Sequence, residues 1–166
     1  MDELTIDTVE RAIIDRLKSR LPDVLVEPFP DNPAEYRLTH PKGAVLVSFS
    51  GSTFSAPDAT DVIVQDRKME FDVTVATKNL RAQGAHQGAY VLLEATRIAL
   101  TGYKIPGYTR IYPKRDGFIA EAGGTWQYGV RFALTAPAIE MEEDEQLVLL
   151  TKITAVDDYG GVEVPK

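Results

Sequence analysis

Cysteine is absent from this chain of 166 residues. Without a thiol, the protein has no disulfide framework, no thiolate nucleophile and no cysteine ligand for zinc. Histidine is scarce as well, because the chain holds only His40 and His86. His40 precedes a proline and His86 lies at an expected helix start, and neither has a second ligand-type residue at metal-binding spacing. We therefore interpret both histidines as structural residues.

Sequence motifs with a known chemical mechanism are missing too. The chain has no P-loop, no GxGxxG after a strand, no GxSxG and no HExxH. The one tryptophan, Trp126, lies in an aromatic-rich strand pattern, where burial or an interface is a more common use than stacking on a base. We therefore expect no enzymatic activity and no cofactor.

Long apolar runs and an excess of positive charge are also lacking. No apolar run approaches the roughly 18 to 20 residues that cross a bilayer, and Met1 to Leu4 do not resemble a secretory signal. The formal net charge is -7, which opposes nonspecific binding to nucleic acid or to an anionic membrane. We expect a protein that stays in the cytoplasm and contacts no membrane.

The composition is that of a globular protein. Hydrophobic residues make up 44% of the chain and charged residues 26%, close to the average of folded domains. The length suits one domain with a sizeable core, so we predict a single domain over residues 1–166. The last ten positions, 157–166, are predicted to be a flexible tail.

Two segments have helical periodicity. From Ile6 to Leu21, apolar residues recur every three or four positions, with Thr5 or Asp7 as a candidate N-cap and Pro22 as the stop. From Ala85 to Leu100 the same period returns, and Gly102 is suited to follow the helix end. Both helices are amphipathic and need a surface to cover.

Short β-branched runs separated by turn residues supply that surface. Irregular loops are expected at 28–41 and 51–61, and hairpin turns at 65–68 and 122–124. The fold class is therefore α+β, a mostly antiparallel sheet flanked by two amphipathic helices. The predicted strands are Val24–Val26, Ala44–Phe49, Val62–Val64, Met69–Thr77, Thr109–Tyr112, Gly117–Glu121, Thr125–Thr135 and Leu147–Val156.

Two groups of carboxylates merit a chemical interpretation. Glu70 and Asp72 are two apart on a strand and so share a face, as a metal site or an acid–base pair requires, although an ordinary polar strand face has the same pattern. Five acids lie in the run Glu140, Met141, Glu142, Glu143, Asp144, Glu145. That run lacks the glycine and spacing of an EF-hand loop, which favours a solvated loop or a contact for a basic partner.

Several stretches together resemble a known family. They are the strand Arg67 to Val75 (RKMEFDVTV), the turn Asn79 to Arg81, and the helix from Gly88 to the sequence Leu100 to Tyr103 (LTGY). The pattern is similar to the tail-terminator and tail-completion proteins of Mu-like contractile-tailed phages and prophages. The first helix and the β-rich last third have the same order as in that family.

The resemblance implies a structural virion protein of the tail, assembled in the host cytoplasm. Such a protein forms a homo-oligomeric ring, typically a hexamer, that caps the head-proximal end of the tail tube and joins the tail to the head. Its partners would be its own copies, the tail tube and sheath proteins, and a head-completion or neck protein. DNA would pass through the ring without specific binding.

A ring needs two different faces on one protomer, and irregular loops are suited to supply them. We expect loop residues to contact neighbouring subunits or tail proteins. For the expected basic loop, which carries Lys104, Arg110, Lys114 and Arg115, the alternative is a solvated surface loop with no partner. The acidic run is a candidate for the channel lining, because like charge keeps DNA from sticking. The interface candidates are Ser52, Phe54, Lys104, Arg110 and Arg115, and the channel candidates are Glu140, Glu142, Glu143, Asp144 and Glu145.

Three other interpretations remain open at the level of sequence. One is another phage neck, tail-completion or baseplate adaptor of the same size and acidity. A second is a metal-dependent enzyme that uses Glu70, Asp72 and the acidic run. A third is a monomeric binding module, whose long loops would hold its ligand.

Overall fold

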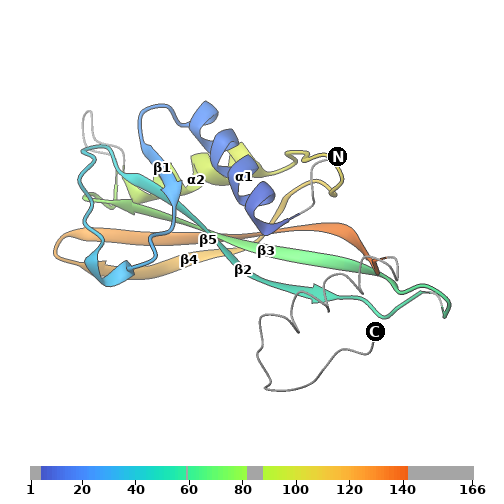
Figure 1. Ribbon diagram of the computed structural model, residues 1–166. Coiled ribbons are helices and arrows are strands. Elements are labelled where there is room, and N and C mark those ends of the chain that lie inside the picture. Colours follow the sequence, from blue (N-terminus) through green and yellow to red (C-terminus); the bar gives the residue numbers. More distant parts are fainter. Residues whose placement is uncertain (1–4, 59, 82–87, 142–166) are drawn as a thin grey trace, which may run out of the picture.

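The structure is a computed structural model that describes residues 5–58, 60–81 and 88–141 (Figure 1). Its centre is a five-stranded sheet in the order β1-β2-β3-β5-β4, in which only the β1–β2 pair is parallel. The α+β class with a mostly antiparallel sheet is therefore confirmed. The elements are α1 (Ile6–Arg20), β1 (Leu25–Pro28), β2 (Ala44–Phe54), β3 (Val64–Thr77), α2 (Ala89–Leu100), β4 (Tyr112–Ala122) and β5 (Thr125–Ile139).

Both helices lie on the same face of the sheet (Figure 1). The helix α1 begins where its sequence predicts, because Thr5 and Thr8 form a reciprocal capping box that satisfies two backbone N–H groups. It ends before Pro22, with Leu21 as the C-cap. The buried stripe of α1 consists of Val9, Ile13, Ile14 and Leu17.

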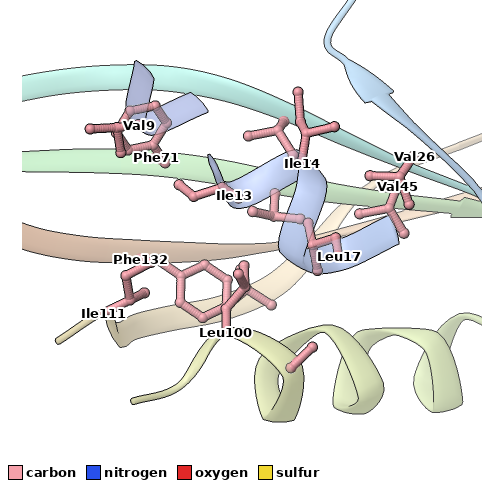
Figure 2. Packing of buried hydrophobic residues seen from close by; sticks show 14 of the residues in the cluster. Val9, Ile13, Ile14, Leu17, Val26, Val45, Phe71, Leu100, Ile111 and Phe132 are labelled. Carbon is pink, nitrogen blue, oxygen red and sulfur yellow. The ribbon is translucent and has the colours of Figure 1, made fainter. Parts of the chain in front are cut away.

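The core lies between this helix layer and the sheet (Figure 2). On β3 the expected alternation is confirmed, since Phe71 and its alternate neighbours are fully buried while Glu70 and Asp72 face the other side. Phe71 pairs across the sheet with Phe49 on β2 and Phe132 on β5. The two central aromatic side chains, Phe71 and Phe132, are among the largest fully buried groups.

One predicted hairpin was wrong. Residues 65–68 do not turn but form the first part of β3, which runs unbroken from Val64 to Thr77. Each residue of this polar stretch pairs with β5, and Arg67 and Lys68 also pair with β2. Ladder hydrogen bonds on both sides hold a segment whose own composition resembles a turn. The true hairpin joins β2 to β3 through residues 55–63.

The strand β2 is correspondingly longer than predicted. It continues to Phe54 instead of stopping at Phe49, and a bulge between Phe49 and Gly51 absorbs one residue. Ser52 and Phe54, expected in an exposed loop, are therefore strand residues. The expected irregular segment 28–41 is confirmed, except that Pro28 ends β1 and that Pro33–Glu35 forms one 3-10 turn.

The second half of the sheet is a single long hairpin. Two separate strands were predicted between 109 and 121, but β4 is continuous, with two bulges, and it starts at Tyr112, so Arg115 lies on a strand and not in a loop. The predicted turn at 122–124 is confirmed. Gly123 and Gly124 both have positive φ, the backbone conformation that a two-residue hairpin turn requires.

The helix α2 begins at Ala89, after Gly88 as its N-cap. A side chain at Gly88 would approach backbone atoms of Arg81 to within 2.4 Å, so this tight contact requires glycine. The predicted helix start at Ala85 and the predicted strand Leu147–Val156 lie outside the described residues. Gly102 follows the helix with a φ of 81°, as its sequence position predicted.

Candidate functional site

The two carboxylates singled out in the sequence lie on the helix-free face of the sheet, side by side on β3. Asp72 accepts two hydrogen bonds from Arg131 of β5, at 2.8 Å from Nε and 2.9 Å from Nη2. Glu70 accepts a hydrogen bond from the ammonium group of Lys114 on β4. Its other oxygen lies 3.8 Å from Nη1 of Arg131. The four charges form one network across three strands.

The pKa shifts in this network are those expected of salt bridges that stabilise a fold. The hydrogen bond from Lys114 holds the pKa of Glu70 below its ordinary value, although partial burial acts in the opposite direction. The hydrogen bond to Asp72 raises the pKa of Arg131. Within the described residues, no three His, Asp or Glu side chains come close enough together to hold a metal ion. The carboxylates are thus occupied by cations of the chain itself.

A groove of about 320 Å³ runs beside the network, between β4 and the centre of the sheet. Phe29 forms part of its wall, and Gly129 leaves room for Ile119, whose Cδ1 would lie 2.8 Å from a Cβ at that position. Arg115, a predicted interface residue, also lines this groove and is exposed. The mixture of charged, hydroxyl and aromatic groups is suited to contacts with another protein.

A second surface lies where β2, β3 and β5 extend beyond the helices (Figure 1). We name Phe54, Val62, Ile63 and Ile139 the sheet end. Their exposed fractions are 55%, 44%, 39% and 61%, although large apolar side chains are usually buried. The ring of Phe54 lies 5.7 Å from the guanidinium group of Arg67, whose Nε donates to Ser52. Two predicted interface residues, Ser52 and Phe54, are thus brought together here.

A third surface lies on the outer side of the helix layer. We name it the helix groove, a hollow of about 420 Å³ between α1 and α2. Ile98, in its wall, is 65% exposed, and Val91, two turns earlier on α2, is 45% exposed. Arg16 and Arg20 supply positive charge at its α1 side. The residues that line it are Arg16, Arg20, Leu21, Ala95, Ile98 and Ala99.

A comparison with known protein families identifies the family of this chain. Residues 13–157 match the profile of the Gp37 protein family. The chain belongs to this Gp37 protein family. The family is phage-related, which fits a phage structural protein in general. No curated protein matches the chain. No helix within the described part of this Gp37-family chain is long and apolar enough to cross a membrane.

Two predicted interface residues of the Gp37-family chain lie in the connection after α2. Lys104 donates a hydrogen bond to the carbonyl oxygen of Tyr108, and Arg110 Nη1 donates to the carbonyl of Gly102 at 2.9 Å. Both side chains thus hold their own loop in shape. The loop is anchored in the core by the buried side chains of Ile105, Tyr108 and Ile111. An interface role of Lys104 and Arg110 stays a prediction.

Of the remaining predicted residues, only some lie in the part of the chain that the structure describes. Glu140 is exposed just after β5, and its backbone N–H donates to the carbonyl of Ile63 at 3.0 Å. Glu142, Glu143, Asp144 and Glu145 lie outside the described residues, as does His86. His40 accepts a hydrogen bond from the backbone N–H of Lys42 through Nδ1, which is a local turn contact.

Of the sheet end, only Phe54 was predicted from the sequence as an interface residue, and no residue of the helix groove was predicted. A signal for the groove was present in α2, whose sequence AYVLLEATRIAL is apolar nearly all round, whereas a surface helix normally has a polar outer face. No such signal existed for the sheet end, because Phe54 ends β2, Val62 and Ile63 lie just before β3, and Ile139 ends β5, far from the others in the sequence.

Proposed function

We propose that this protein is a tail terminator, a structural protein that forms a ring at the head-proximal end of a phage tail tube. In this role the ring stops further growth of the tube and presents a surface to which a head-completion or neck protein binds. The ring consists of copies of this chain, with six as the expected number. Tail tube and sheath proteins contact it from the other side.

The observation that carries the proposal is the match to the Gp37 family over residues 13–157, which extends from within α1 through the whole sheet. The resemblance of the β3, α2 and following segments to tail-terminator proteins makes the role more specific. The match concerns most of the chain, so the family relation does not depend on one short motif.

The distribution of exposed apolar side chains supports an assembling protein. Contiguous apolar patches that are exposed on a protein surface commonly mark protein–protein contacts. Here the sheet end and the helix groove are two different surfaces of one protomer. A closed ring is built from heterologous contacts, which need two different surfaces.

The proposal includes a structural rather than an enzymatic role. The carboxylates that would serve a metal-dependent reaction, Glu70 and Asp72, are paired with Lys114 and Arg131. A metal ion would have to displace these cations before it bound. The net charge of -7 supports a ring through which DNA passes without being held.

Light scattering and electron microscopy of the full-length protein test this role. The purified chain is measured alone and after mixing with isolated tail tubes. We expect ring-shaped particles, free or at one end only of each tube. Binding along the tube sides, or at the baseplate end, would overturn the terminator role and favour another tail adaptor. A chain that stays monomeric and leaves both tube ends bare would overturn the proposal altogether.

A further inference from the structure

We propose that the sheet end of one copy of this chain docks into the helix groove of the next copy. This inference rests on the proposed ring and names its subunit interface. Each copy would offer its sheet end to one neighbour and its helix groove to the other. The contact therefore repeats around a ring in one direction.

Apolar complementarity is the first argument. The sheet end presents Phe54, Ile63 and Ile139, and the helix groove presents Ile98 next to Ala95. The only charged residues on α2 are Glu94 and Arg97, which pair with each other at 2.8 Å. The outer side of α2 therefore carries no net charge that would oppose contact with an apolar partner.

Charge complementarity is the second argument. The helix groove has two cations, of which Arg16 is fixed by a hydrogen bond from Nε to the carbonyl of Ala99 at 3.0 Å, while Arg20 is exposed. Around the sheet end, the exposed acids are Asp58, Asp61, Asp66 and Glu140, and they outnumber Arg67, the cation that lies over the ring of Phe54. Opposite charges at the edge of an apolar contact orient the partners and exclude wrong ones.

The shape of the protomer decides between a contact within one chain and a contact between chains. The sheet end projects beyond the helix layer (Figure 1), and the helix groove lies within that layer, between α1 and α2. From the buried Phe71 to Val64, seven residues of β3 at about 3.4 Å each give about 24 Å of rigid, paired strand. The sheet end therefore does not fold back into its own groove. The partner is a second copy, and the contact is heterologous.

Disulfide trapping tests the contact directly, because the natural chain has no cysteine. One full-length variant carries Ile63→Cys and a second, with a different affinity tag, carries Ile98→Cys. After mixing and mild oxidation, we expect a disulfide-linked dimer that contains both tags. The double variant Ile63→Cys/Ile98→Cys should give a ladder of linked chains. The matched control replaces Ile63→Cys by Ile119→Cys, which is 51% exposed on β4 and should not link to Ile98→Cys.

A charge exchange provides a second readout. Arg20→Glu should lower the yield of the mixed dimer about fivefold, and adding Asp61→Arg to the other chain should restore it. Linkage of positions 63 and 98 within one chain, or equal linkage of the Ile119 control, would overturn the inference. Rings without the 63–98 linkage would also overturn it but would leave the proposed function standing. Linked chains that never bind tube ends would overturn the proposed function instead.

Discussion

The ion pair between Asp72 and Arg131 provides the sharpest test of whether the polar face of the sheet is structural. We consider Asp72→Ala, Arg131→Ala and the double variant, which together form a double-mutant cycle. The pair joins two strands by two charge-assisted hydrogen bonds, 2.8 and 2.9 Å long. Its side chains are 28% and 37% exposed, so solvent screens part of the attraction. The coupling free energy should be about 1 kcal/mol, near the upper end of the range for such pairs.

Urea unfolding monitored by circular dichroism measures this coupling at neutral pH and at two salt concentrations. In thermal unfolding followed by the same signal, each single variant should lower the melting temperature by about 2 to 4 °C. The matched control is the cycle of Glu94 and Arg97, an exposed pair within α2 for which a smaller coupling is expected. A coupling of Asp72 and Arg131 no larger than that of the control would refute the reasoning. Stabilisation by a divalent metal that Asp72→Ala abolishes would instead favour a metal site.

Three further predictions concern stability. Thr5→Ala removes the N-cap of α1 and should cost about 1 kcal/mol in urea unfolding, so an unchanged midpoint would count against the capping box. The hydroxyl of Thr96 is buried without a hydrogen-bond partner among the described residues, and Thr96→Val should therefore raise stability by about 1 kcal/mol; a loss of stability would disprove this. Because Lys114 lowers the pKa of Glu70, the folded state gains stability from the ionised carboxylate at neutral pH, and this gain disappears as the pH falls through the lowered pKa. Wild type should exceed Glu70→Gln in stability at pH 7 but not in acid, and a difference that persists in acid would contradict this origin.

The sequence predicted those parts of the fold that depend on local patterns. The three-to-four spacing in α1, the alternation around Phe71 and the glycine pair after Ala122 each identify their element without knowledge of the partner. The polar stretch 65–68 resembles a turn, and only its pairing with β2 and β5 makes it a strand. Pairing of this kind joins residues about 70 positions apart, such as Arg67 and Ala136, and leaves no local trace.

The same distinction applies to the candidate site. That Glu70 and Asp72 share a face follows from the period of a strand, and this prediction was confirmed. Their partner Arg131 lies 59 residues from Asp72, so the sequence alone did not separate a metal site from an ion pair. The exposed apolar residues of α2 were visible in its sequence, but the groove they form depends on the position of α1.

Tail length in a phage or prophage whose genome carries the gene for this chain tests the central proposal most directly. Particles produced with and without the gene for this chain are compared by electron microscopy, and the length of every tail tube is recorded. The terminator role predicts that tubes formed without the chain vary widely in length and carry no heads, and that supplying the wild-type chain restores both properties. Uniform tubes joined to heads in the absence of the chain would contradict it.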